Sequence, residues 1–302
     1  MKIGVVMGGV SSEYEVSLQT GKEIMAHLDH RKHDIYPIEI KSKKELIAKV
    51  TDLDFVFLAL HGNFGEDGTI QGTLDTMEIP YTGSGLTASS LCMNKELTKK
   101  LLRYEGIPTP DWAVVRNPEE FDLHKLEQLG YPLVVKPNSG GSSVGTHIVR
   151  NPQELLNAIQ EASKLDSEVM VEKYIQGEEI TCSLLAGELL PILSIKPKDE
   201  FFNYTSKYAD GGAEETIIEL NPALHHLIEQ ISKNCYQTLK CSVYARVDII
   251  LQKDVPYVLE VNTLPGMTKN SLFPKSAKAA GISFNRLLEL LMEYSLTDSN
   301  SL

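Results

Sequence analysis

RVDIILQKDVPYVLEVN, residues 246–262, is the stretch that decides the fold. Two runs rich in β-branched and aromatic residues, 244–251 and 257–261, are separated by the polar Gln252-Lys253-Asp254. Apolar runs around a short polar break are typical of a β-hairpin. We therefore predict a hairpin whose turn centres on Asp254.

Such a turn brings charged side chains opposite one another. Asp248 lies opposite Glu260, and Arg246 lies opposite Asn262, with residues two apart on one face. Two directly opposed carboxylates repel each other unless a cation lies between them. Asp, Glu and Asn offer the oxygen ligands that Mg²⁺ prefers, so the pattern predicts a metal–phosphate site. The alternative is a solvated polar face on an edge hairpin, which the apolar residues on the other face disfavour.

The whole chain is long and acidic. Its 302 residues exceed what one hydrophobic core comfortably supports, so we expect two or three lobes. A hydrophobic content of 42% and a charged content of 23% are ordinary for a globular protein. The net charge of −12 argues against nucleic acid or an anionic membrane as partner. A chain with this charge that binds an anionic nucleotide must gather its lysines locally.

The cysteines and the N-terminal residues indicate the compartment. Cys92, Cys182, Cys235 and Cys241 form no CxxC pair and have no zinc-site spacing, so we expect reduced core residues. The chain opens directly on a strand pattern without the shape of a signal peptide. No run is long enough to cross a bilayer. These features predict a cytoplasmic protein.

Two glycine-rich loops follow predicted strands in the first 70 residues. GGVSSE at 8–13 leads from a strand into a helix, where Glu13 could cap the helix or face a ligand. HGNFGEDG at 61–68 follows the strand 55–60, at the sheet edge where α/β proteins bind ligands. His61 fits a structural role and a ligand role equally well.

A third glycine-rich segment carries a lysine. The strand 132–135 leads Lys136 into PNSGGSSVG at 137–145, whose backbone N–H groups can fold over phosphates. The segment lacks the GK[ST] ending of a Walker loop, so a P-loop is excluded. Strand-like flanks predict a hairpin lid instead, and the alternative is a mobile surface hairpin.

Lys95, Lys136, Lys173 and Lys207 are the gathered cations that this acidic chain requires, and with the lid and the acidic hairpin they outline a phosphate site. At this point a resemblance becomes specific. The chain resembles the D-alanine–D-alanine ligase family of the ATP-grasp superfamily over nearly its full length. The segments that carry the resemblance are GGVSSEYEVS (8–17), ALHGNFGEDGTIQG (59–72), YTGSG (81–85), VKPNSGGSSVG (135–145), RVDI (246–249) and LEVNTLPGMT (259–268).

The resemblance implies an α/β fold of the ATP-grasp type, in which an N-terminal parallel α/β domain precedes two α+β lobes that clamp ATP. The implied divisions are 1–92, 93–178 and 179–302. It further implies that ATP phosphorylates one D-alanine and that a second D-alanine attacks the acyl phosphate. The product, D-alanyl-D-alanine, serves bacterial peptidoglycan synthesis. The resemblance also implies a homodimer and two Mg²⁺ or Mn²⁺ ions.

Roles for single residues also follow from the resemblance. Asp248, Glu260 and Asn262 would hold the metal ions, and Lys207 would reach the transferred phosphoryl group. Arg246 and the N–H of Gly266 would stabilise the oxyanion. The remaining nucleotide contacts would be Lys95, Lys136, Glu172, Lys173, Ile175 and Glu179. The remaining substrate and lid contacts would be Glu13, His61, Ser142, Tyr208, Ser271 and the N–H of Leu272.

One departure and two rival functions stay open. Some relatives carry charged residues where Ser139 and Gly140 stand, which bears on lid flexibility. In the family, tyrosine at position 208 accompanies the amide product and phenylalanine the ester. A different ATP-grasp ligase would share the hairpin, so Glu13 and the loop 61–68 decide between the two. A regulatory nucleotide-binding protein without chemistry should have lost a metal ligand or Arg246, and none is lost.

Overall fold

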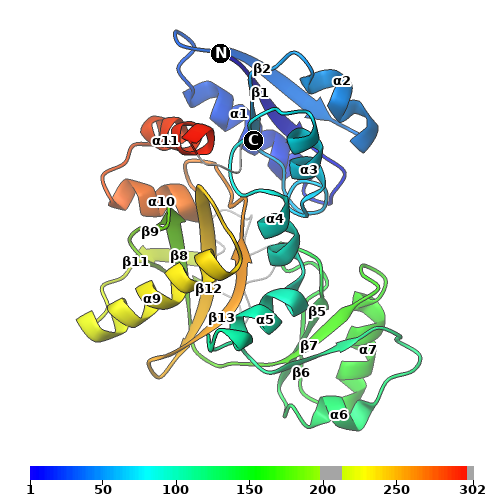
Figure 1. Cartoon of the computed structure of the whole chain (residues 1–302). Coiled ribbons are helices and arrows are strands. Elements are labelled where there is room, and N and C mark those ends of the chain that lie inside the picture. Colours follow the sequence, from blue (N-terminus) through cyan, green and yellow to red (C-terminus); the bar gives the residue numbers. More distant parts are fainter. Residues whose placement is uncertain (198–212, 298–302) are drawn as a thin grey trace.

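The computed structural model describes residues 1–197 and 213–297, which form three sheets flanked by helices (Figure 1). One sheet is parallel and two are antiparallel. The expected mixed α/β architecture is confirmed. In this described part of the chain, six helices do not belong to the strand groups: η1 (Lys43–Glu45), α2 (Leu46–Val50), α3 (Thr69–Thr76), α6 (Leu123–Glu127), α10 (Leu272–Ala279) and α11 (Phe284–Thr297).

The N-terminal lobe contains the parallel sheet, in the order β2-β1-β3. Its strands are β1 (Lys2–Gly8), β2 (Asp34–Ile40) and β3 (Phe55–Leu58). Parallel neighbours need a crossover, and α1 (Tyr14–His27) lies in the first one. Gly8 has a φ of +88°, and a Cβ there would lie 2.7 Å from the Ile40 carbonyl oxygen, so the turn out of β1 requires glycine. The two glycine-rich loops therefore leave the sheet at the same edge.

The central lobe is a four-stranded antiparallel sheet in the order β4-β7-β5-β6. Its strands are β4 (Trp112–Val115), β5 (Leu133–Pro137), β6 (His147–Val149) and β7 (Val169–Lys173). Helix α7 (Pro152–Ala162) packs on β5 and begins where the Asn151 side chain accepts the Glu154 N–H. Because β5 and β6 pair directly, the segment between them is a hairpin, as predicted.

The large sheet has the strand order β11-β10-β8-β12-β13, and β9 pairs with β8. Its strands are β8 (Glu178–Leu185), β9 (Glu188–Leu189), β10 (Leu193–Pro197), β11 (Ala213–Ile217), β12 (Tyr244–Gln252) and β13 (Val255–Asn262). Three helices pack near this sheet: α4 (Leu86–Met93), α5 (Lys95–Tyr104) and α9 (Pro222–Thr238) (Figure 1). The predicted hairpin thus lies at one side of a larger sheet.

The turn of this hairpin differs from the prediction. Lys253 and Asp254 both have positive φ angles, 48° and 66°, so these two residues form the turn and its centre lies between them. Gln252 pairs with Val255 in consequence.

A β-bulge then restores the predicted partners farther from the turn. The register shifts next to Asp248, which leaves Leu259 as an extra residue on β13. Asp248 lies opposite Glu260, and Arg246 lies opposite Asn262. The predicted pairing is therefore confirmed, although it depends on a bulge that the sequence pattern does not indicate.

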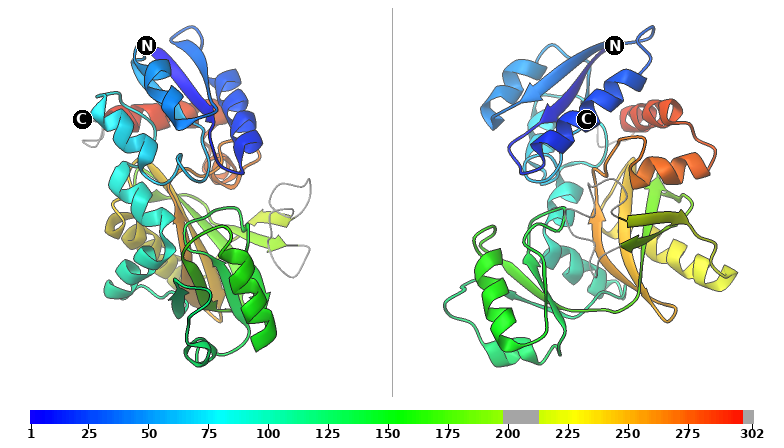
Figure 2. Two further views of the ribbon diagram at one scale, coloured as in Figure 1. Left: turned by 90° about the vertical axis from the view of Figure 1, so that its right-hand side faces the viewer. Right: turned by 180° about the vertical axis from the view of Figure 1, so that it is seen from behind.

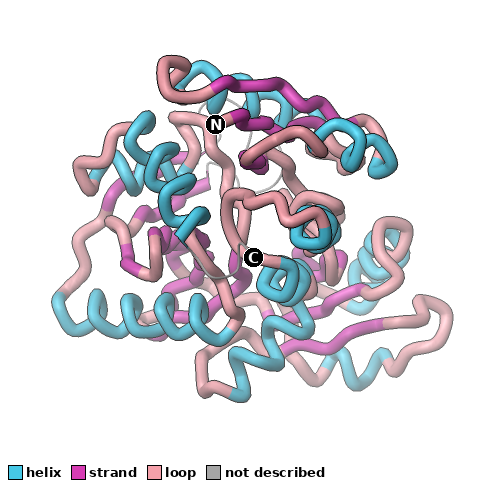
Figure 3. Tube along the Cα trace, turned by 45° about the horizontal axis from the view of Figure 1, so that its top comes forward, coloured by secondary structure: helices cyan, strands magenta, loops and turns pink. Residues whose placement is uncertain are grey.

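Three apolar cores hold the chain together, and two of them join distant segments. One combines the N-terminal sheet with α10 and α11. Figure 2 shows these C-terminal helices beside the N-terminal lobe, and Figure 3 shows which parts of the chain are helix, strand and loop. A second core unites α4 and α5 with the large sheet, and the third fills the central lobe. The divisions at 92 and 178 stay a prediction.

Two further expectations concern the cysteines and membranes. All four cysteines are buried and free, as predicted for core residues. Among the described residues, none of the helices combines the length and apolar character that a bilayer span requires.

Candidate active site

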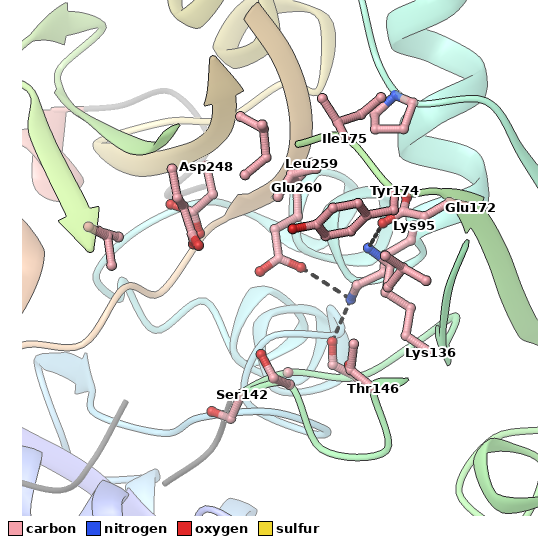
Figure 4. A pocket seen from close by; sticks show the side chains of 18 of the residues that line it. Lys95, Lys136, Ser142, Thr146, Glu172, Tyr174, Ile175, Asp248, Leu259 and Glu260 are labelled. Atoms are coloured by element: carbon pink, nitrogen blue, oxygen red, sulfur yellow. Dashed lines mark hydrogen bonds and ion pairs between the residues drawn. The ribbon is translucent and has the colours of Figure 1, made fainter. Parts of the chain in front are cut away.

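A cavity of about 610 Å³ lies where the central lobe faces the large sheet (Figure 4). The predicted nucleotide and metal residues that line it are Lys95, Lys136, Glu172, Lys173, Ile175, Glu179, Asp248 and Glu260. Three of the four predicted cations therefore meet at one site. The fourth, Lys207, lies outside the described residues, as does Tyr208.

Asp248 is buried and fully engaged by neighbouring side chains. Arg246 donates to both of its oxygens, from Nε over 2.9 Å and from Nη2 over 2.8 Å. Thr181, opposite it on β8, donates to Oδ1 over 2.7 Å, and Asn262 Nδ2 donates to Oδ2 over 3.0 Å. Although burial alone would lower the pKa of Arg246, Asp248 holds that pKa above its ordinary value. A solvated polar face is thereby excluded for Asp248.

Lys95 connects the acidic hairpin to the glycine-rich flap, residues 140–145. Its Nζ lies 3.4 Å from Glu260 Oε2 and donates to the Gly140 carbonyl over 2.5 Å (Figure 4). Arg246 and Lys95 thus supply the cations that the opposed carboxylates need. The expectation that cations accompany the opposed carboxylates is confirmed, and two of these cations are side chains of the protein.

The oxygen donors nevertheless suit Mg²⁺. Asp248 and Glu260 line the cavity, and Asn262 lies two residues beyond Glu260 on β13. No cluster of three or more His, Cys, Asp or Glu side chains suited to a metal exists in residues 1–197 and 213–297. Two carboxylates and an amide leave coordination positions for water and phosphate, which is how Mg²⁺ binds beside nucleotides. The residues present therefore fit the ion.

Glu172 pairs with two lysines, an arrangement that the sequence pattern does not indicate. Its side chain is buried, with Oε1 2.5 Å from Lys136 Nζ and Oε2 2.9 Å from Lys99 Nζ. Burial alone would raise the pKa of Glu172, but Lys136 and Lys99 lower it to about 2. The Glu172 carboxylate therefore pairs with two lysines at the edge of the cavity, and its contact with the nucleotide stays a prediction.

The flap contacts the N-terminal lobe through Glu13. The Ser142 hydroxyl donates to Glu13 Oε1 across 129 positions of the chain. Glu13 precedes α1 but its side chain makes no capping bond, so it faces the site. A Cβ at Gly62 would lie 2.9 Å from Glu13 Oε2, and one at Gly141 would lie 3.3 Å from it. Two glycines thus make room for this carboxylate, and the predicted Glu13–Ser142 contact is present.

His61 lies behind Glu13 and is buried. Its Nε2 is 3.0 Å from the Thr20 hydroxyl on α1. Burial lowers the pKa of His61, and the neighbouring Glu13 opposes this shift. In the same loop, burial and then Glu13 raise the pKa of Glu66 to about 8, while Glu66 Oε2 accepts the Gly62 N–H over 2.5 Å. Of these two loop residues, the sequence interpretation named only His61.

Ser271 and Leu272, two of the predicted substrate contacts, lie at the start of α10. Ser271 immediately precedes the helix, and its Oγ is 2.8 Å from Thr268 Oγ1. Leu272 is the first helical residue, so its N–H is one of the unpaired donors of a helix N-terminus, which favours a carboxylate. A Cβ at Gly266 would lie 3.1 Å from Ser271 Oγ, which places Gly266 beside the same site.

Sequence interpretation missed two buried partners. Thr181 is brought to Asp248 by strand pairing over 67 positions, which no local pattern indicates. Lys99 carries a local signal, because it lies four residues after Lys95 and therefore on the same side of a helix.

Comparisons with known proteins find one enzyme family over nearly the whole chain. The family models described as D-ala D-ala ligase N-terminus and C-terminus match residues 2–84, in two overlapping segments, and 101–293. A D-alanine–D-alanine ligase of Clostridium botulinum (strain Loch Maree / Type A3) is 55% identical, covering 98% of this chain and 99% of the relative. A crystal structure of the Bacillus anthracis D-alanine–D-alanine ligase complexed with ATP is 51% identical, with a TM-score of 0.90, and the match covers 98% and 97% of the two chains. The D-Ala:D-Ser ligase VanG of Enterococcus faecalis is 31% identical, with a TM-score of 0.84 and coverage of 97% and 99%.

Proposed function

Because the chain belongs to the D-alanine–D-alanine ligase family, we propose that it uses ATP to join two D-alanine molecules into D-alanyl-D-alanine, the dipeptide of bacterial peptidoglycan precursors. The observation that carries this proposal is the continuity of the site. Lys95 contacts both the acidic hairpin and the flap, and the flap contacts Glu13. Direct contacts therefore link the residues proposed to bind the nucleotide and the metal to Glu13, which is proposed to bind the amino acid.

In the first step, a carboxylate oxygen of one D-alanine attacks the γ-phosphorus of ATP. The bond from that phosphorus to the β–γ bridging oxygen breaks, and ADP leaves. Lys95 and Lys136 offset phosphate charge, and Glu13 holds the ammonium of the first D-alanine. Two Mg²⁺ ions held by Asp248, Glu260 and Asn262 would neutralise charge on the phosphates.

In the second step, the amine of the other D-alanine attacks the acyl carbon. A C–N bond forms, a proton leaves the nitrogen, and the bond from carbon to the phosphate oxygen breaks. The tetrahedral oxyanion is met by Arg246 and by the Gly266 N–H. The acceptor carboxylate binds Ser271 and the Leu272 N–H at the start of α10, which favours an anion there.

The reaction is tested by phosphate release from ATP and Mg²⁺ in the presence of D-alanine or L-alanine. We expect release with D-alanine and little with L-alanine, because Glu13, His61 and Arg246 fix three directions around the chiral carbon. Equal release with both isomers, or none with either, would refute the proposal. D-Serine belongs in the same assay as acceptor, because VanG shares the fold and is named a D-Ala:D-Ser ligase.

The flap should close over the nucleotide. It contains three glycines, and it includes Ser142 and Ser143 at positive φ angles of 53° and 57°, a strained conformation for non-glycine residues. We expect fast amide exchange at 140–145 in the free protein and slow exchange with ATP and D-alanine, which would exclude water from the acyl phosphate.

Hydrogen exchange followed by mass spectrometry measures this directly. Ser142→Ala, which removes the contact with Glu13, should lose part of the protection while ATP still binds. Equally slow exchange with and without ligands would contradict a lid. The proposal has three further parts: Tyr208 joins the contact between Glu13 and Ser142, the protein is a homodimer, and it is located in the cytoplasm.

A further inference from the structure

Lys99 does not line the cavity, but it lies directly behind a residue that does. Lys99 on α5 has a side chain with 0% exposure, and its Nζ lies 2.9 Å from Glu172 Oε2. The same ammonium donates to Thr109 Oγ1 over 2.8 Å and to the Pro110 carbonyl over 3.2 Å. The Lys99 ammonium therefore combines two hydrogen bonds with one ion pair. A buried lysine is rare unless it is paired, and this one is held in one position.

The pairing connects Lys99 to a residue that does line the cavity. Glu172 shares its carboxylate between Lys99 on one oxygen and Lys136 on the other. The group contains two positive charges and one negative charge. Without the Lys99 charge, Glu172 would cancel the charge of Lys136, and this part of the wall would be neutral toward the nucleotide.

We propose that Lys99 is a positioning residue of the nucleotide site, which engages Glu172 from behind so that Lys136 presents a net positive charge to the phosphates of ATP. This inference rests on the proposed function only in its choice of nucleotide. Lys99 touches neither the cavity nor the substrates, so it acts entirely through Glu172 and Lys136.

A pH dependence follows from the charges that surround Lys99. Burial lowers the pKa of Lys99 to about 8; Glu172 opposes this shift, and Lys136 and Arg103 add to it. Phosphate binding favours the charged form of the group. At pH values below 8, ATP should therefore bind tightly. The affinity should fall as the pH rises through 8, where Lys99 loses its proton.

The test measures the Kd of Mg²⁺·ATP by calorimetry between pH 6.5 and 9.5 without D-alanine. In the unaltered protein we expect affinity to fall through about pH 8. Lys99→Met should bind about tenfold more weakly at pH 7, a change equivalent to about 1.4 kcal/mol. Lys99→Arg should bind well with a flat profile, because a guanidinium does not titrate in this range. Lys100→Met removes the same charge from an exposed neighbour on α5 and should bind like the unaltered protein.

A charge-restoring pair separates this role from a structural one. Lys99→Met with Glu172→Gln again leaves one net positive charge on Lys136, so the double variant should bind ATP more tightly than Lys99→Met alone. A merely structural role predicts that the second substitution weakens binding further, and that result would overturn the proposal. So would a pH-independent Kd in the unaltered protein, which needs no variant to fold. Failure of the ligase reaction is seen separately, as absent D-alanine-dependent phosphate release while ATP still binds.

Discussion

Glu260→Gln should lower turnover by about 10²–10³-fold, the size expected when several kcal/mol of transition-state charge stabilisation is lost. The substitution keeps the shape of the side chain and removes one of the two carboxylates proposed to hold Mg²⁺. Its ion pair with Lys95, at 3.4 Å with 24% of the Glu260 side chain exposed, should contribute less than about 1 kcal/mol to folding. Steady-state turnover at increasing Mg²⁺ and a thermal melt measure the two effects.

Asp248→Asn makes the same charge change at a buried position. Relief of the repulsion from Glu260 would raise stability if the two carboxylates stood alone. The structure reverses that expectation, because Asp248 pairs with Arg246 through two hydrogen bonds. Breaking a buried pair costs about 3–5 kcal/mol, so this variant should lose both stability and turnover. Glu188→Gln, on β9 of the same sheet, is the control for a lost carboxylate. Normal turnover of either hairpin variant at saturating Mg²⁺ would show that the hairpin is not the metal site.

Arg246→Lys should lower kcat by about 10²–10³-fold, as expected for the loss of one preorganised oxyanion donor. Lysine keeps the positive charge beside Asp248, but its single nitrogen cannot make the bidentate contact. It also cannot contact Asp248 and the oxyanion at the same time. The protein should therefore stay folded while the second step slows. Single-turnover assays that follow ADP and dipeptide separately measure this, because acyl-phosphate formation should be affected less.

Arg246→Met is the harsher companion variant. It leaves Asp248 buried without its cation and should unfold at lower temperature as well as losing activity. A kcat for Arg246→Lys within a few-fold of the unaltered protein would remove Arg246 from the oxyanion role and leave it as a structural partner of Asp248.

Local patterns determined more of this protein than its size suggests. The hairpin and the face shared by Arg246 and Asp248 follow from strand periodicity, which has a range of a few residues. The pairing of Asp248 with Glu260 also requires the bulge at Leu259, which the local pattern does not indicate. The flap follows from glycine and serine content between two strands. Lys95, Lys136 and Lys173, which line the cavity, each lie beside a local element that the sequence pattern indicates.

The tertiary structure alone decided how the charges of the site are balanced. Arg246 and Lys95 compensate the opposed carboxylates, Thr181 binds Asp248 from another strand, and Glu172 is held by two lysines. Apart from Arg246, which lies two residues before Asp248 on β12, these partners come from segments distant in sequence. The interaction energies of all of them depend on burial, which only the packed chain sets. The same reason applies to α10 and α11, which join the N-terminal core although they are the last helices of the chain. Periodicity predicts an apolar face, but which surface covers that face is a property of the whole fold.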